Sequence, residues 1–189
     1  SKKFNIPIEE YEKDMDKEKK NEILEIFKSS NNLRTKEEFE EIMFDLREAC
    51  IIGDLGLMKI YLGETIEDDS KILKFKIDKT KKTASLFKIK DNIREIIVPR
   101  AVKHESIEYL ITSISDIGHD IKTLKFVEDS AVKTIYNHAF SHSVIEEFFI
   151  PSSLKELKEG WCFFTSNLTK IVVSPSNGQF IMKEDKYLL

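Results

Sequence analysis

The second half of the chain repeats one short apolar pattern at almost constant intervals. Four segments have an apolar residue at their first, fourth and sixth positions, the pattern L-x-x-L-x-L: residues 93–98, 121–126, 145–150 and 168–173. Their starting points are 28, 24 and 23 residues apart. A unit of this length cannot bury its own apolar side, whereas stacked units share one continuous core. The pattern therefore predicts a solenoid of short parallel strands, one strand from each coil.

Secondary markers recur in phase with these strands. The pair Ala139-Phe140 is matched by Cys162-Phe163 at an offset of 23. Two apolar pairs fill the stretch between the strand and this marker, Val132/Ile135 and Leu154/Leu157. The first unit, residues 93–120, is irregular because it contains an expanded stretch at 103–109. From this phase we expect four aromatic side chains to face the core: Phe126, Phe140, Phe148 and Phe163.

Residues 150–157 (Ile-Pro-Ser-Ser-Leu-Lys-Glu-Leu) and 132–140 (Val-Lys-Thr-Ile-Tyr-Asn-His-Ala-Phe) resemble the repeat of the BspA-like leucine-rich-repeat family. Ser143 or its neighbour stands where that family has a cysteine, and residues 161–163 (Trp-Cys-Phe) depart from its Ala-Phe form. The resemblance covers residues 93–189. It implies a right-handed solenoid of short parallel strands with a binding or adhesive role, and no catalytic residues.

The first part of the chain has helical periodicity instead. Apolar side chains at i, i+3, i+4 and i+7 run from Phe39 to Cys50, which predicts an amphipathic helix that begins at Thr35. A highly charged helix is expected before it, at residues 9–28. Gly53-Asp54 ends the second helix, and Asp54 is placed to cap a short third one.

These patterns predict an α+β protein with a helical N-terminal domain or cap at residues 1–65 and a solenoid at 66–189. Alternating apolar and polar residues at 71–90 predict a β-hairpin that leads into the solenoid. Residues 46–55 are similar to the helix–turn–helix of an ankyrin-type unit, although no second copy occurs.

Charge and composition exclude several functions. The net charge is −4, and the one strongly basic stretch, residues 71–90, reads as a solvated strand pair rather than a nucleic-acid-binding face. No apolar run is long enough to span a bilayer, and the first residues carry no secretory signal pattern. Cys50 and Cys162 lie in apolar runs and read as small buried hydrophobes. We expect a cytoplasmic protein, or one at the cell surface if a signal peptide precedes this sequence.

The sequence carries none of the common catalytic motifs. The sequence has no phosphate-binding glycine loop, nucleophile elbow or metalloprotease motif. His138 and His142 have a metal-ligand spacing, but no third ligand lies nearby in the sequence. Residues 167–169, Asn-Leu-Thr, form a glycosylation sequon. We therefore expect no enzyme activity, cofactor or metal.

The strand pattern also predicts a surface. Because side chains alternate along a strand, the fifth residue of each pattern points outward when the fourth and sixth point inward. The outward residues form a row of Ile97, Lys125, Phe149 and Val172, with a polar rim that includes Arg94, Lys122, Glu146 and Lys170. This face is either covered by the helices or the hairpin, or it is a partner site. We expect it to bind a protein partner; the alternatives are a BspA-like surface adhesin and a scaffold piece that stacks end to end or as a homo-oligomer.

Overall fold

The computed structural model describes residues 3–4, 21, 34–35, 46–47, 49–183 and 187–188. The chain divides into two compact units, Ser1–Glu64 and Thr65–Leu189. The helix predicted at 9–28 and most of the helix predicted at 35–50 lie outside the described residues. In the first unit, β1 (Lys3–Phe4) and β2 (Arg34–Thr35) form a short antiparallel pair.

A helix–turn–helix element ends the first unit. Residues 49–52 are helical, and Gly53 follows in the left-handed conformation with φ of +68°. The Asp54 carboxylate then accepts a hydrogen bond from the backbone N–H of Leu57 at 2.9 Å, which caps α3 (Leu55–Tyr61). The predicted break at Gly53-Asp54 and the predicted cap are both confirmed.

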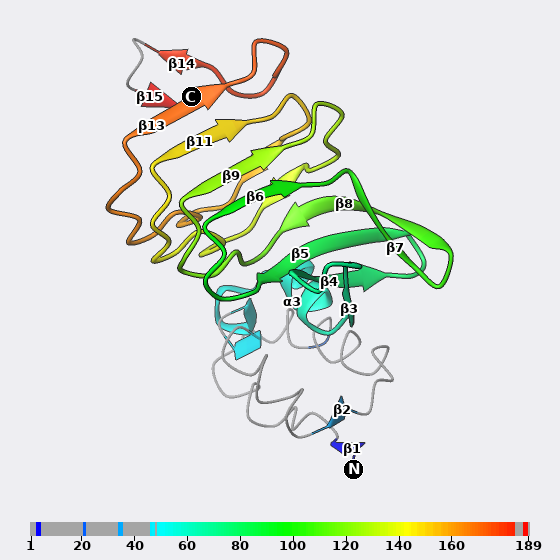
Figure 1. Cartoon of the computed structure of the whole chain (residues 1–189). Helices are drawn as coiled ribbons and strands as arrows, with labels where there is room; N and C mark the ends of the chain where they lie inside the picture. Colours follow the sequence, from blue (N-terminus) through cyan, green and yellow to red (C-terminus); the bar gives the residue numbers. More distant parts are fainter. Residues whose placement is uncertain are drawn as a thin grey trace. The chain divides into compact units, whose positions relative to one another are not determined.

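The second unit is a β-solenoid, and its first sheet contains the four repeated segments. The strands are parallel neighbours in the order β13-β11-β9-β6 (Figure 1). Each begins two residues after the start of its pattern: β6 (Glu95–Val98), β9 (Thr123–Phe126), β11 (Glu147–Ile150) and β13 (Lys170–Val173). The predicted solenoid, with one strand from each coil in a parallel sheet, is confirmed.

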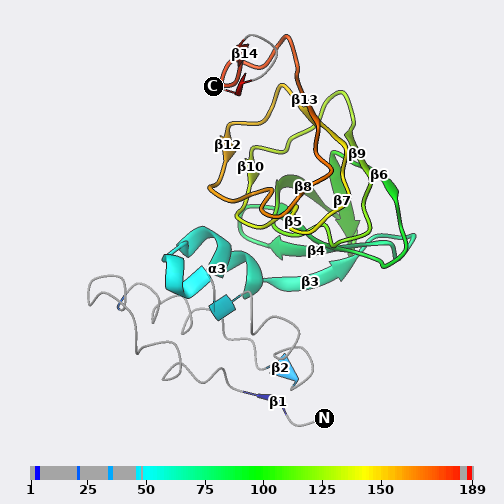
Figure 2. The same cartoon turned by 90° about the vertical axis from the view of Figure 1, so that its left-hand side faces the viewer.

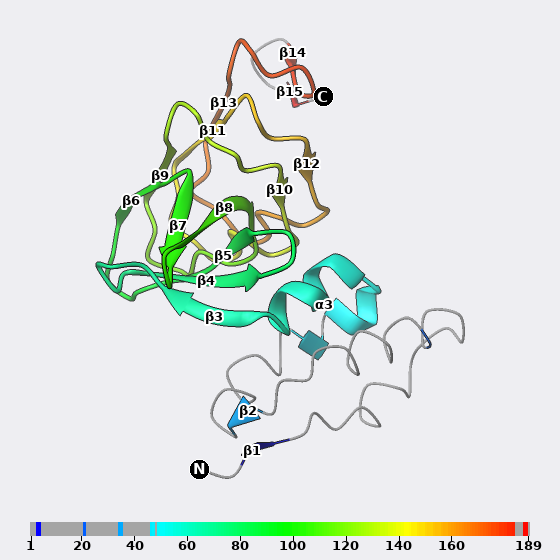
Figure 3. The same cartoon turned by 90° about the vertical axis from the view of Figure 1, so that its right-hand side faces the viewer.

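A second sheet, absent from the sequence prediction, lies on the opposite side of the coils (Figures 2 and 3). Its order is β12-β10-β8-β5-β4-β3, and β10 pairs in parallel with both β8 and β12. The apolar pairs Val132/Ile135 and Leu154/Leu157 end in the two-residue strands β10 and β12. The strands are β3 (Glu64–Glu67), β4 (Leu73–Asp78), β5 (Thr83–Ile89), β8 (Ile107–Ile114), β10 (Thr134–Ile135) and β12 (Glu156–Leu157).

The predicted hairpin at 71–90 is confirmed as the antiparallel pair β4–β5. β5 also pairs in parallel with β8, so the hairpin supplies the first strands of the second sheet. One lysine of this stretch departs from the expected solvated face. Lys76 is only 3% exposed; its Nζ donates to Thr65 Oγ1 at 2.7 Å and lies 4.7 Å from the centre of the Phe87 ring.

The expanded stretch at 103–109 is the turn of a second hairpin. β7 (Ala101–His104) pairs antiparallel with the start of β8. Glu105 and Ser106 connect the two strands with φ of +48° and +66°. Two successive left-handed residues match a type I′ turn, whose twist suits a hairpin. The first repeat is therefore longer because it contains an additional strand.

Phe163 corrects the sequence prediction, because its side chain is 51% exposed rather than buried. The prediction assumed an offset of 23 residues, whereas Thr134 pairs with Glu156, an offset of 22. Left-handed residues repeat at the same offset, as His138 with φ of +58° and Gly160 with φ of +69°. The coil is one residue shorter here, and this difference moves Phe163 out of the core.

Trp161, a partly buried side chain, packs against the core in place of Phe163. At the offset of 22, Trp161 corresponds to Ala139, and the backbone N–H of Phe140 donates to the Trp161 carbonyl at 2.8 Å. The Trp161 ring centre lies 5.4 Å from that of Phe140 and 5.0 Å from that of Phe148. Phe140 and Phe148 are fully buried, as predicted, and Phe126 packs against them as a partly buried side chain.

Candidate interaction surface

The outward side chains of the first sheet lie in one row across its four strands. Ile97 pairs with Lys125, and Phe149 pairs with Val172. The pairing of Phe148 with Leu124 continues the row by placing Phe149 beside Lys125. Adjacent strands lie about 4.8 Å apart, so the row is roughly 14 Å long. We name it the outward column: Ile97, Lys125, Phe149 and Val172.

Two apolar members of the outward column are open to solvent. Ile97 is 59% exposed and Phe149 is 39% exposed, while the next residue of each strand, Val98 or Ile150, is buried. Lys125 is exposed and Val172 is half-buried. The leading hairpin does not cover this face, because it belongs to the second sheet. Most of the helices that formed the other candidate cover lie outside the described residues.

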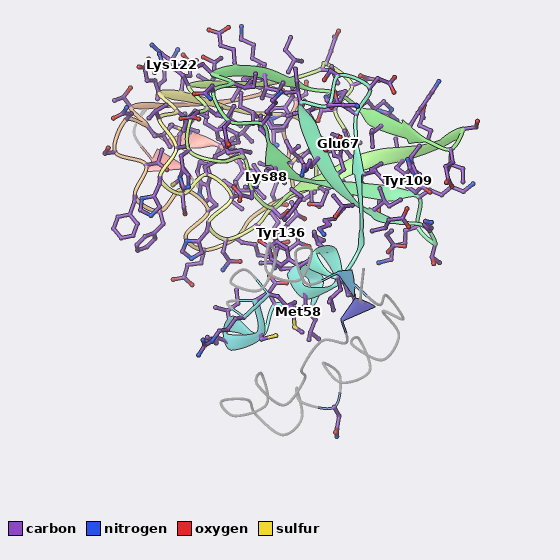
Figure 4. All side chains as sticks on the ribbon, turned by 60° about the horizontal axis from the view of Figure 1, so that its bottom comes forward. Met58, Glu67, Lys88, Tyr109, Lys122 and Tyr136 are labelled. Carbon is purple, nitrogen blue, oxygen red and sulfur yellow. The ribbon has the colours of Figure 1, made fainter. Side chains whose placement is uncertain are left out.

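The polar rim is largely paired within the chain. Lys122 Nζ lies 3.2 Å from Glu146 Oε1, across the gap between two coils. Lys170 Nζ lies 2.9 Å from Glu147 Oε1 in the same manner. Figure 4 shows Lys122 at the outer surface of the solenoid. Such exposed pairs contribute less than about 1 kcal/mol each to stability, and both lie near the starts of the strands, on one side of the outward column.

A second exposed cluster, which the sequence analysis missed, lies in the turns. The His142 ring is stacked on Phe164 at 5.0 Å and meets His119 edge-on at 5.8 Å. Phe164 is 68% exposed and contacts Phe163 at 4.7 Å. An offset of 22 instead of 23 would have revealed it, since His142 and Phe164 are 22 residues apart and both have positive φ.

The other candidate groups take structural positions. The His138 ring lies beside Phe163, with its Nδ1 3.1 Å from Ser141 Oγ. Among the described residues, no three His, Cys, Asp or Glu side chains are placed to hold a metal ion. Both cysteines are free thiols. Burial raises the pKa of Cys50 to about 12 and also raises that of the half-buried Cys162, which favours the unreactive thiol form at neutral pH.

Asp116 follows β8 and accepts a hydrogen bond from the backbone N–H of Gly118 at 2.7 Å. Burial raises the pKa of its carboxyl above the usual value, against the opposing effects of this hydrogen bond, His119 and Lys88. The folded state therefore holds the proton more tightly than the unfolded state. The ionised carboxylate costs stability above the folded-state pKa, and this cost disappears as the pH falls below the unfolded value.

Replacing Asp116 by Asn should consequently raise the melting temperature at neutral pH, because the amide oxygen still accepts from Gly118 and carries no charge. The gain should disappear near about pH 3, where the unfolded carboxyl is also protonated. Thermal unfolding followed by circular dichroism at both pH values measures the difference. A melting temperature at neutral pH equal to or below that of the unaltered chain would contradict the expectation.

The parallel strands, the coils of about 23 residues and the open strand face define a short leucine-rich-repeat β-solenoid. The predicted resemblance of residues 93–189 is confirmed at the level of the fold. No helix in the part of the chain that the structure describes is long and apolar enough to cross a membrane.

Comparison with solved structures finds three proteins at low sequence identity. The pneumococcal vaccine antigen PcpA is 15% identical with a TM-score of 0.44, over 62% of this chain and 40% of that one. A leucine-rich cell-surface protein of Faecalibacterium prausnitzii is 11% identical with a TM-score of 0.31, over 65% of this chain and 57% of that one. A leucine-rich-repeat protein of Bacteroides capillosus is 19% identical with a TM-score of 0.40, over 58% of this chain and 98% of that one. No protein-family model and no curated protein sequence matches this chain.

Proposed function

We propose that this chain is a non-catalytic module that binds a protein partner through the outward column. The observation that carries the proposal is the register of the first sheet, which places Ile97, Lys125 and Phe149 side by side. Exposed apolar side chains in a contiguous row, with a polar rim, are typical of an interaction site. The two ion pairs form a charged border along one side of the row.

Phe149 is the anchor of the proposed site. It is the largest apolar side chain of the outward column and lies in an inner strand, β11, between β9 and β13. Aromatic residues near the centre of an interface commonly account for about 2 kcal/mol or more of binding free energy. Replacing Phe149 by Asp removes the apolar contact and adds a charge that a partner would have to desolvate. The fold should remain, because the side chain points away from the core.

The test selects ligands without assuming a natural partner. A library of random linear peptides displayed on phage is panned against the immobilised full chain, and the retained peptides are then measured on variants. We expect peptides whose affinity falls about tenfold or more on Phe149→Asp. Phe164→Asp is the matched control, because it alters an exposed Phe in a turn away from the first sheet, and it should leave these affinities unchanged.

A measurement of stability shows whether a loss of binding comes from the contact or from the fold. Chemical unfolding should show that Phe149→Asp changes the free energy of unfolding by no more than about 1 kcal/mol. Peptides that bind the unaltered chain and Phe149→Asp equally well, across the whole selected set, would overturn the proposed site.

A cell-surface adhesin is a second form of the same proposal. Asn167 of the Asn-Leu-Thr sequon is exposed in the turn before β13, where a glycan is sterically acceptable. Glycosylation of Asn167 would indicate an extracellular compartment. Binding through the outward column serves either compartment, so the selection tests the binding site, and glycosylation of Asn167 in the native protein tests the compartment.

A further inference from the structure

We infer that the partner presents an acidic side chain between two apolar ones, aligned with Lys125 of the outward column. This inference rests on the proposed function and adds the chemistry of the ligand. It follows from where the cations of this face lie and which of them already have counter-charges.

Lys125 occupies the middle of the apolar row. It pairs directly with Ile97 of β6, and the register of β9 and β11 places Phe149 on its other side. A partner that covers Ile97 and Phe149 must therefore also cover Lys125. The lysine side chain is exposed, and no ion pair joins it to another residue in the described part of the chain.

Three neighbouring cations are already paired. Lys122 and Lys170 pair with Glu146 and Glu147 at 3.2 and 2.9 Å. Beyond the other end of the strands, Arg100 donates to the Asp129 carbonyl at 2.6 Å and lies 3.6 Å from its carboxylate. Arg94 is exposed and has no ion pair in the described part of the chain, but it lies three positions before Ile97, outside the outward column. Lys125 is therefore the cation that a partner covering Ile97 and Phe149 must also cover.

Loss of water from the Lys125 ammonium group makes a carboxylate on the partner important. Burying an unpaired ammonium group is strongly unfavourable, whereas a carboxylate at hydrogen-bond distance offsets the lost hydration. Glu95 also directs the acidic group of the partner toward Lys125. It lies two residues before Ile97 on the same face, opposite Thr123, and repels an acidic group one row away.

Strand geometry gives the spacing of the ligand. Ile97 and Phe149 lie two strands apart, roughly 10 Å, with Lys125 midway. In an extended peptide, side chains at alternate positions share one face. The expected motif in a peptide that crosses the strands is therefore apolar, acidic and apolar at alternate positions, with all three side chains facing the sheet.

The experiment sequences the peptides whose binding depends on Phe149. We expect the apolar–acidic–apolar motif to be enriched among them, and their affinity to fall about tenfold or more on Lys125→Glu. Replacing the peptide's acidic residue by Lys should restore binding to Lys125→Glu. Lys155→Glu is the matched control, because Lys155 is an exposed lysine immediately before β12, which belongs to the second sheet.

The outcomes separate the two proposals. Phe149-dependent peptides that lack the acidic residue and bind Lys125→Glu unchanged would overturn the ligand chemistry and leave the proposed function standing. If no selected peptide depends on Phe149, both proposals fail. Sedimentation equilibrium tests a second copy as the occupant: self-association that is lost in Phe149→Asp and unaffected by Lys125→Glu would also overturn the acidic motif.

Discussion

Replacing Phe148 by alanine should lower the free energy of unfolding of the solenoid by about 4 kcal/mol, within the usual range for a fully buried Phe. The side chain is 0% exposed. Its ring centre lies 5.0 Å from Phe140, 6.2 Å from Phe126 and 5.0 Å from Trp161, so one substitution removes three ring contacts, two to the preceding coil and one within its own coil. The neighbouring coils are held by their own backbone pairing and cannot collapse fully into the space that is left.

Phe149→Ala is the matched control, since the next residue of the same strand has the same side chain on the opposite face. Its loss should stay below about 1 kcal/mol. Urea unfolding followed through the fluorescence of Trp161, the one tryptophan of the chain, reports on the solenoid itself. Phe148→Leu, with an expected loss of about 1–2 kcal/mol, provides a measurement if the alanine variant does not fold. Equal losses for Phe148→Ala and Phe149→Ala would contradict the assignment of the two faces.

Asn177→Ala should cost about 2–4 kcal/mol, because it leaves several polar groups unpaired in a buried turn. Asn177 is 8% exposed. Its Nδ2 donates to the carbonyls of Pro151 and Leu154 at 2.7 and 3.0 Å, which ties it to the preceding coil. Its Oδ1 accepts from the backbone N–H groups of residues 179 and 180, both at 2.8 Å.

The same Trp161 measurement tests this expectation. Ser176→Ala, an exposed neighbour in the same turn, should change stability by less than about 0.5 kcal/mol. Asn177→Asp separates the donors from the acceptor, since it keeps Oδ1 and places a carboxylate against two carbonyls. It should be at least as destabilising as Asn177→Ala at neutral pH. A loss for Asn177→Ala no larger than that for Ser176→Ala would show that the four hydrogen bonds do not stabilise this turn.

Local pattern was sufficient to predict the first sheet. The alternation that buries Phe148 and exposes Phe149 follows from the pleat of a strand, and the in-phase spacing of the patterns gave the order of the strands. The helix cap at Asp54 was also readable, because capping depends on residues a few positions apart.

The second sheet could not be predicted in the same way. β10 and β12 are two residues long, and the apolar pairs that lead into them are spaced three apart, without the period of two that marks a strand. The parallel pairing of β5 with β8 joins residues almost 30 apart, and nothing local to either strand signals it. The turn at Glu105 and Ser106 was missed because it contains neither Asn nor Gly, the usual signals of a type I′ turn.

For the candidate surface, the sequence was sufficient to predict which residues share the outward column. The exposed fractions of Ile97 and Phe149 depend on what packs over the sheet, which required the structure. The ion pairs of Lys122 and Lys170 likewise depend on the register between coils, and this register leaves Lys125 as the central cation of the row.

The coil that is one residue shorter shows how such a chain can diverge without losing its core. The offset is 22 where β12 pairs with β10 and 23 where β13 pairs with β11, so the side chains are shifted only in the part of the coil around β12 and the backbone pairing is kept. Trp161 then supplies the ring that Phe163 would otherwise have supplied. Homologous coils that differ by a deletion are therefore expected to match in core volume and not in the residue that fills it. Aligning them by residue type alone would assign the buried ring to the wrong position.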